Sequence, residues 1–419
     1  GNHMSQLIMK GKFLKNISSS DYQDLKPDLV GWLDRVYQRY QRDFDIVVLE
    51  GAGSPVEINI NKLDISNMEM ARIADSPVVL VADIDRGGVF ASIVGTLSLM
   101  SDEERSRVKG VIINKFRGRK DYFSEGVRLL EDIIKIPVLG VVPYQKLGID
   151  EEDGVSEKTY KEAKQVYSKD KLNVVVLKLD HMSNYTDFNV FEHIEGLELS
   201  YISPDQDLEA FDGQNGQVGP DLLIIPGSKN TLGDMERLNK SPMRDQILAY
   251  SKRGGLIVGL CGGYQMLGQT IRDDRGLDGS RGKVDGLGLL EVDTVFGSDK
   301  ITGQVRWNFG HEEGYFFGLE NSQIEGYETH LGRTYPGPDD NYKIKDGHIM
   351  GTYCHGLFDS AGFLSGLLNN IAKARGLART FEVKDYRAIK NEEYNKLADL
   401  IRENVDMEKV YNIIFSRDI

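Results

Sequence analysis

The sequence predicts an α/β protein made of two doubly wound domains. Short apolar runs, each suited to a buried parallel strand, alternate with stretches long enough for a helix. The runs form two series, which are separated by a charged segment over residues 145–170 that contains few apolar side chains. The chain has 419 residues, of which 40% are hydrophobic, so it is long enough to bury two such cores.

The first series predicts a domain over residues 1–150. Its helix is expected at Leu29–Arg42, which has one polar face. Its strands are expected at Asp45–Leu49, Val78–Val81, Gly110–Ile113 and Val138–Val142. Residues 151–170 are then expected to be a linker with some helix.

The second series predicts a domain over residues 171–375. Its strands are expected at Leu172–Leu177, Leu222–Ile225, Leu256–Val258 and His348–Tyr353. Short β-like pieces within 283–335, such as Leu287–Val295 and Ile324–His330, predict an antiparallel extension. Residues 376–419 predict a C-terminal helical extension that is amphipathic over 391–417.

Composition limits the partners of the chain. The formal net charge of −14 argues against nucleic acid or an anionic membrane as a partner. No apolar run in the sequence approaches the length of a membrane span. Two cysteines, Cys261 and Cys354, give no disulfide framework, so a reducing, cytoplasmic setting is expected.

The stretch 259–268, GLCGGYQMLG, predicts an activated thiol. Cys261 follows an apolar run and precedes two glycines, which predicts a strand that turns sharply into a helix with the sulfur exposed at the turn. The N-terminus of the helix would favour the thiolate form. The alternative is a cysteine buried in the core.

A nucleophilic cysteine needs a base and donors for an oxyanion. His355 is the best candidate base, because it follows a predicted strand and precedes a glycine; His330 is the rival. Backbone N–H groups of Gly227 and Ser228, with that of Gly262, would form the oxyanion hole. The alternatives are a structural histidine and an ordinary strand-to-helix loop.

These residues resemble the nucleophile elbow of class I glutamine amidotransferases, whose pattern is G-x-C-x-G-x-Q. The resemblance implies that Cys261 attacks the side-chain amide of glutamine and that Gln265 contacts the bound glutamine. The family usually has Glu two residues after the histidine, whereas this sequence has Leu357 there. A Cys-His pair is therefore expected, with Glu328 as a weaker option for orienting a histidine.

Three further strings narrow the resemblance. PGSKNT (226–231), GYETH (326–330) and YCHGLF (353–358), together with the missing Glu, resemble the branch that amidates cobyrinic acids in cobalamin synthesis. This branch couples glutamine hydrolysis to amidation.

Polar residues follow the predicted strands of the first domain. They are Glu50, Asp64, Asp83, Asp85, Arg86 and Asn114. Carboxylates at strand ends commonly hold Mg²⁺ beside nucleotide phosphates, which makes Glu50 and Asp83 candidate Mg²⁺ ligands. Arg86 would face a phosphate or a substrate carboxylate, and Asn114 would contact the base. The alternative is a set of ordinary strand ends.

DIDRGGVF (83–90), NKFRG (114–118) and LDHMSNYTDF (179–188) resemble the cobyric acid synthase family. The resemblance implies a dethiobiotin-synthetase-like, P-loop-type ATPase domain. There ATP, with Mg²⁺, would phosphorylate the b, d, e and g carboxylates of adenosylcobyrinic acid a,c-diamide before ammonia displaces the phosphate. The alternatives are a cobyrinic acid a,c-diamide synthase and a non-catalytic partner protein on an ATPase scaffold.

The family's P-loop is missing from this sequence. No G-x-x-x-x-G-K-[ST] string occurs, so the first strand and the phosphate-binding loop of the ATPase domain are expected to be absent. We predict that this chain binds ATP weakly or not at all. Isothermal titration calorimetry measures this directly, and tight binding of ATP would contradict the prediction.

Overall fold

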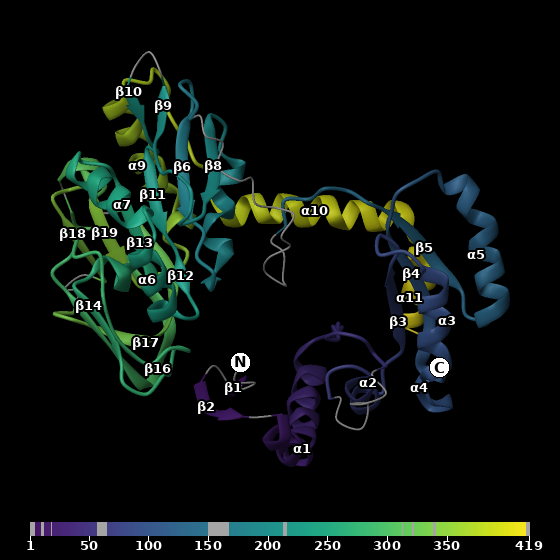
Figure 1. Cartoon of the computed structure of the whole chain (residues 1–419). Helices are drawn as coiled ribbons and strands as arrows, with labels where there is room; N and C mark the ends of the chain where they lie inside the picture. The colour runs from purple at the N-terminus through teal and green to yellow at the C-terminus, as the bar shows by residue number, and fades with distance from the viewer. Residues whose placement is uncertain are drawn as a thin grey trace. The chain divides into compact units, whose positions relative to one another are not determined.

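The computed structural model divides the chain into two compact units (Figure 1). It describes residues 5–9, 12–17, 19–56, 65–149, 167–212, 216–311, 313–320, 322–337 and 341–415. Unit 1 comprises Gly1–Gly148 and Glu392–Ile419, and unit 2 comprises Ile149–Asn391. The predicted linker, 151–170, lies outside the described residues up to residue 166.

Unit 1 contains a parallel sheet that, in its described residues, has the order β3 (Val78–Asp83), β4 (Val108–Phe116), β5 (Val138–Pro143). All three strands fall on predicted apolar runs. The other elements are the hairpin β1 (Ser5–Met9) and β2 (Lys12–Ile17), and the helices α1 (Ser19–Asp43), α2 (Met68–Ala74), α3 (Val89–Leu99), α4 (Asp102–Arg107), α5 (Lys120–Ile134) and α11 (Met407–Phe415).

Successive side chains of β4 belong to two different hydrophobic clusters of unit 1. Val111 and Ile113 are fully buried in one cluster, with apolar residues of α3 and α5. Ile112 belongs to a different cluster, which contains Leu139 and Val405. Because successive side chains of a strand point to opposite faces, helices cover both faces of the sheet.

The C-terminal helices differ from the prediction of a separate extension over 376–419. Helix α10 (Tyr386–Asn404) begins in unit 2, and its second half packs in unit 1 with α11. The backbone of Val405 bridges Gly140 of β5, where any side chain on Gly140 would overlap Asn404. The amphipathic pattern of these helices predicts an apolar face, but it does not predict which residues that face packs against.

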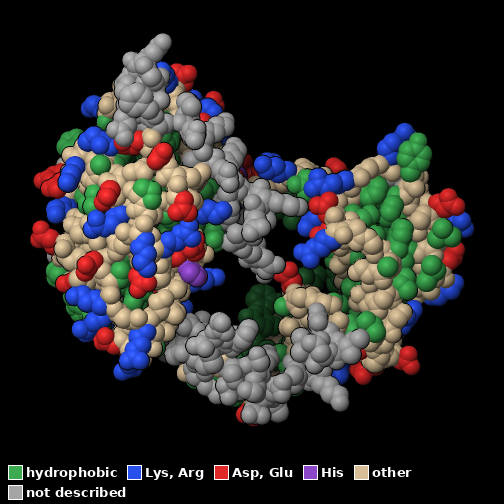
Figure 2. All heavy atoms as spheres, viewed as in Figure 1, with side chains coloured by type: hydrophobic (Ala, Val, Ile, Leu, Met, Phe, Trp, Pro, Cys, Tyr) green, Lys and Arg blue, Asp and Glu red, His purple; other side chains and the backbone are tan. Residues whose placement is uncertain are grey.

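The strand predicted at Asp45–Leu49 is wrong. These residues are irregular, and Val48 is 87% exposed. A strand needs a neighbour for its backbone hydrogen bonds, and no described strand pairs with this run. Figure 2 shows that hydrophobic side chains gather on the viewed face of unit 1. On unit 2, acidic and basic side chains are scattered over the viewed face.

Unit 2 is built on a sheet whose described strands have the order β18-β19-β13-β11-β6-β8. The parallel strands are β6 (Leu172–Leu177), β8 (Leu197–Ile202), β11 (Leu222–Ile225), β13 (Ile257–Leu260) and β19 (Ile349–Thr352), while β18 (Tyr342–Lys345) is antiparallel. The helices are α6 (Thr231–Lys240), α7 (Met243–Lys252), α8 (Gly262–Leu267) and α9 (Ala361–Arg375). The four predicted apolar runs match β6, β11, β13 and β19, which are buried along their whole length. The edge strand β8, which is only partly buried, was not predicted.

A second sheet of unit 2 corresponds to the predicted extension. Its order is β15-β14-β16-β17, and the long strands β16 and β17 pair antiparallel. The strands are β14 (Thr270–Asp273), β15 (Gly282–Asp285), β16 (Asp293–Asn308) and β17 (Gln323–Tyr335). Short elements complete the unit: β7 (Met182–Ser183), β9 (Ala210–Asp212), β10 (Gly216–Val218), β12 (Gly227–Ser228) and the 3-10 helices η2 (Tyr185–His193), η3 (Gly314–Phe316) and η4 (Leu357–Asp359).

Within the described residues, no helix is both long and apolar enough to span a membrane.

Candidate functional site

Cys261 stands at a sharp turn between β13 and α8. Its backbone has φ +51° and ψ −106°, a left-handed conformation that residues other than glycine rarely adopt. Only 8% of Cys261 is exposed, so the sulfur is more enclosed than the sequence suggested. The thiol points toward the carbonyl oxygen of Thr329, with Sγ 3.8 Å from that oxygen. The predicted strand–turn–helix elbow is thus present.

The glycines after Cys261 permit close backbone packing. A Cβ on Gly263 would overlap the carbonyl oxygen of Ile225, at the end of β11. A Cβ on Gly262 would lie 2.8 Å from the backbone nitrogen of Ser228. Only glycine therefore lets the start of α8 approach the turn after β11 this closely.

His355 and Asp187 form a buried pair beside the thiol. His355 follows β19, is 0% exposed and donates from Nδ1 to Oδ2 of Asp187 over 2.8 Å. Oδ1 of Asp187 accepts the backbone N–H of Gly356 over 2.9 Å. The thiol lies close by, since a Cβ on Gly227 would be 3.6 Å from Cε1 of His355 and 3.8 Å from Cβ of Cys261. The three side chains have the order Cys-His-Asp, which orients and activates a nucleophile in many hydrolases.

The environment of His355 favours the imidazolium. Burial alone lowers its pKa, but the hydrogen bond to Asp187, the charge of that carboxylate and the nearby sulfur of Cys261 outweigh it, so the pKa of His355 rises to about 10. Because the folded-state pKa lies above the ordinary 6.5, this pair stabilises the fold fully below pH 6.5. The contribution is lost as the pH rises through about 10.

Two neighbours enclose His355. The ring of Tyr327 stacks on the imidazole with centroids 5.1 Å apart, and the two residues exchange backbone hydrogen bonds of 2.8 and 3.1 Å. The side-chain amide nitrogen of Asn184 lies 2.8 Å from Nδ1 and 2.7 Å from Nε2 of His355. His355 is therefore held through its backbone, its ring face and its ring nitrogens.

The predicted oxyanion residues lie next to the elbow. Gly227 and Ser228 form β12, which pairs antiparallel with β7. A Cβ on Gly227 would lie 3.6 Å from Cε1 of His355 and 3.8 Å from Cβ of Cys261. The structure therefore brings Gly227, Ser228 and Gly262 together around Cys261.

Gln265 and the rival His330 lie in a buried network behind the elbow. Nε2 of Gln265 donates to the hydroxyl of Tyr353 over 3.2 Å, and Gln265 is only 2% exposed. The ring of His330 stacks on Tyr353 with centroids 3.6 Å apart. Nδ1 of His330 donates to the carbonyl of Gly332 over 2.7 Å. His330 thus belongs to the network around Tyr353, whereas His355 lies by the thiol with a buried carboxylate hydrogen-bonded to its ring over 2.8 Å.

Sequence reasoning missed Asp187. Leu357, at the position of the expected Glu, is fully buried in η4. Glu328, the weaker option, lies 3.5 Å from Nε2 of His330. The available signal was LDHMSNYTDF, which follows a buried strand of the same sheet as the strand before His355. That string contains two aspartates, and only folding selects Asp187 over Asp180.

The candidate nucleotide residues of unit 1 meet where β3 and β4 end. Asp83 pairs in register with Asn114 and accepts from Nζ of Lys115 over 2.8 Å. Partial burial raises the pKa of Asp83, but hydrogen bonds from Lys115 and from the Asp85 N–H outweigh it and keep the pKa below the usual value. Asp85 accepts from Nε of Arg117 over 2.7 Å.

The other candidates of unit 1 are less engaged. Arg86 is exposed near enough to Asp83 to lower its pKa. Glu50 is exposed in the irregular segment after α1, and Asp64 lies outside the described residues.

The predicted Mg²⁺ site does not fit the described residues as they are arranged. The Asp83 carboxylate is already paired with Lys115, and Asp85 with Arg117. Across the described ranges, no three His, Cys, Asp or Glu side chains gather closely enough to hold a metal ion. In this arrangement the described residues therefore supply no Mg²⁺ site.

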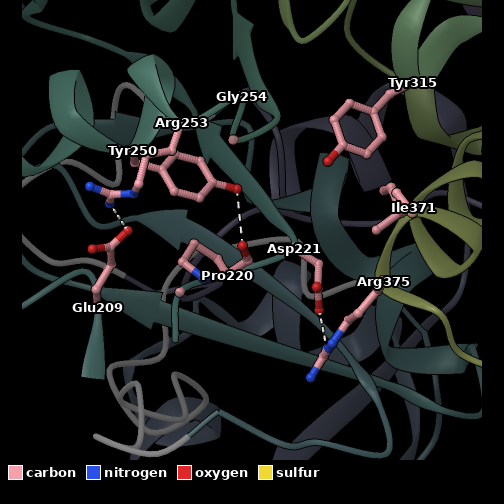
Figure 3. A pocket seen from close by; sticks show the side chains of 12 residues that line it. Glu209, Pro220, Asp221, Tyr250, Arg253, Gly254, Tyr315, Ile371 and Arg375 are labelled. Atoms are coloured by element: carbon pink, nitrogen blue, oxygen red, sulfur yellow. Dashed lines mark hydrogen bonds and ion pairs between the residues drawn. The ribbon is translucent and has the colours of Figure 1, made fainter. Parts of the chain in front are cut away.

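A separate pocket of about 280 Å³ opens in unit 2 at the amino ends of the strands (Figure 3). Asp221 precedes β11, and Gly255 precedes β13. The charged side chains that line this pocket are paired, Asp221 with Arg375 and Glu209 with Arg253. Cys261 and Ser228 follow the carboxyl ends of β13 and β11, so this pocket lies at the opposite edge of the sheet from the elbow.

Family models match both units. Residues 173–363 match the CobB/CobQ-like glutamine amidotransferase domain, and residues 8–151 match an AAA domain. The two α/β domains predicted from the sequence are thereby confirmed.

Relatives match along nearly the whole chain. A protein of Clostridium botulinum (strain Alaska E43), described as cobyric acid synthase, is 43% identical over 99% of this chain and 83% of its own length. One of Alkaliphilus metalliredigens, with the same description, is 40% identical over 98% and 83%. A solved structure of PurLQS from Thermotoga maritima is 19% identical with a TM-score of 0.34, covering 48% of this chain and 98% of that one.

Proposed function

The chain belongs to the cobyric acid synthase family, the glutamine-dependent amidoligases of cobalamin biosynthesis, and we propose that Cys261, His355 and Asp187 form its glutaminase site. One observation carries this proposal. A cysteine in a strained elbow lies beside a fully buried histidine, whose Nδ1 is 2.8 Å from a buried aspartate. This arrangement supplies a nucleophile, a proton carrier and an orienting carboxylate.

The first half-reaction transfers the glutamyl group to sulfur. Sγ of Cys261 attacks the side-chain amide carbon of glutamine, and the carbonyl oxygen gains the electron pair. The N–H groups of Ser228 and Gly262 stabilise this oxyanion. The C–N bond then breaks as His355 protonates the nitrogen, which leaves as ammonia and a glutamyl thioester remains on Cys261.

The second half-reaction regenerates the enzyme. Neutral His355 removes a proton from water, whose oxygen attacks the thioester carbon. The collapse of the second oxyanion breaks the C–S bond, releases glutamate and returns the thiolate–imidazolium pair. Asp187 keeps Nδ1 protonated throughout, so that Nε2 handles every transferred proton.

The experiment measures both products of glutamine. The protein is expected to release glutamate and ammonia in equal amounts, and a diazoketone analogue of glutamine is expected to label Cys261, as read by peptide mass spectrometry. Glutamine should protect against labelling. Labelling at another residue, or glutamine consumption without glutamate, would contradict the proposal.

The ammonia is used in amidation by this family, and the finer substrate is part of our proposal. It is adenosylcobyrinic acid a,c-diamide, amidated at its b, d, e and g carboxylates after activation by ATP. Amidation of the a and c carboxylates instead would identify a cobyrinic acid a,c-diamide synthase. The fragment masses of the amidated products show which carboxylates were amidated, and so distinguish the two enzymes. Nucleic acid and membrane have no role in this proposal, because the protein is acidic and its proposed substrates are small molecules.

A further inference from the structure

We propose that Asp234 is a positioning residue for the oxyanion-binding turn and that His181 holds Asp234 in place. This proposal rests on the glutaminase function proposed above. It concerns residues that touch neither the thiol nor His355 in the described contacts. It assigns a role to His181, a histidine half-exposed in the connection after β6.

Asp234 lies in the first turn of α6 with its side chain only 1% exposed. Its Oδ2 accepts from the Ser228 hydroxyl over 2.6 Å and from the His181 backbone N–H over 3.3 Å. Its Oδ1 accepts from Nδ1 of His181 over 2.8 Å. Burying a carboxylate without hydrogen bonds destabilises a fold. These three donors therefore offset the free-energy cost of burying Asp234.

The partners of Asp234 come from two paired segments. Ser228 ends β12, and His181 directly precedes β7, its antiparallel partner. The backbone N–H of Lys229 donates to the carbonyl of His181 over 2.8 Å. Asp234 therefore fastens both segments to the start of α6.

This fastening controls the direction of the Ser228 peptide. The Ser228 hydroxyl also accepts the backbone N–H of Asn230 over 2.9 Å, so the side chain fixes the turn on both sides. The Ser228 nitrogen faces Gly262, which supplies the second oxyanion donor. Without Asp234 the hydroxyl loses its acceptor, and the Ser228 N–H is free to rotate away from the oxyanion.

The connection after β6 then supports both halves of the site. Through His181 it holds the oxyanion-binding turn, and through Asp187 it orients His355. The base and the oxyanion donors are thus positioned by one short segment of chain.

The test compares two reactions of the same thiol. Glutamine hydrolysis needs an oxyanion hole, whereas alkylation by iodoacetamide is a direct displacement of iodide that forms no oxyanion. Asp234→Asn is expected to lower kcat for hydrolysis about 10- to 100-fold, somewhat less than the loss of an oxyanion donor. The KM for glutamine and the alkylation rate of Cys261 should stay within about twofold.

The matched control is Glu236→Gln, an exposed carboxylate two residues along the same helix, which should behave as the parent. Because Asp234→Asn removes a buried charge, a second series uses the half-exposed His181. His181→Ala should show the same kcat loss, and His181→Asn, whose amide nitrogen reproduces the position of Nδ1, should restore much of it.

Unchanged kcat in Asp234→Asn and His181→Ala would overturn the proposal. Parallel loss of hydrolysis and alkylation would also overturn it, because that result indicates general damage to the nucleophile. Failure of the glutaminase function itself looks different, since the parent protein would then be alkylated at Cys261 yet release no glutamate.

Discussion

Cys261→Ala is expected to lower the rate of glutamine hydrolysis by about 10⁴-fold or more, because it removes the sulfur that is proposed to attack the amide carbon. The substitution removes only Sγ from a residue that is 8% exposed. Alanine also tolerates the elbow backbone no worse than cysteine. Binding of glutamine and the melting temperature should therefore change little.

The measurement is glutamate release at saturating glutamine, with a melting curve for each variant. Cys354→Ala is the matched control, since Cys354 is the other cysteine of the sequence. Burial raises the pKa of Cys354 to about 12, so this thiol is a poor nucleophile at neutral pH. Hydrolysis that survives in Cys261→Ala, or is lost in Cys354→Ala alone, would refute the assignment of the nucleophile.

The sheet of unit 2 was the most predictable part of the fold. Leu172–Leu177 and Leu222–Ile225 are continuous apolar runs, and they coincide with β6 and β11. Such runs are unambiguous because a central parallel strand buries both of its faces. The run Asp45–Leu49 has the same local character, yet no described strand pairs with it. Local pattern therefore predicts which segments suit a strand, while pairing decides which of them become one.

The residues of the candidate site also divide into those that the sequence could predict and those that it could not. Cys261 and its oxyanion neighbours were predictable because short-range stereochemistry demands glycine at the elbow and the turn after β11. Asp187 was not, since it acts on a histidine 168 residues away and lies in a 3-10 helix rather than at a strand end. Its role depends on how the connection after β6 folds back over His355.

Asp187→Asn is expected to reduce kcat for glutamine hydrolysis about 10²- to 10⁴-fold, as for the carboxylate of other triads. The structure gives the reason. Asp187 accepts from two donors, Nδ1 of His355 and the backbone N–H of Gly356. Asparagine has one acceptor oxygen, so it satisfies one donor and turns its NH₂ group toward the other. The imidazole then loses either its orientation or its tautomer.

The same substitution should move the pH dependence in a defined direction. In the parent, the imidazolium persists until the pH rises through about 10, and activity that needs it falls there. Removing the carboxylate takes away the largest of the influences that raise the pKa of His355, while burial still favours the neutral ring, so this pKa falls. The alkaline limb of kcat should therefore shift to lower pH.

The control for this shift is Asp180→Asn, in the same connection, where the carboxylate is half-exposed and pairs with Arg237. It should keep the parent's profile, because Asp180 makes no described contact with His355. A merely structural role for Asp187 would lower the amount of folded enzyme without moving the limb. An unmoved limb in Asp187→Asn would thus assign the control of His355 to Asn184 and Tyr327, the other two side chains that enclose the ring.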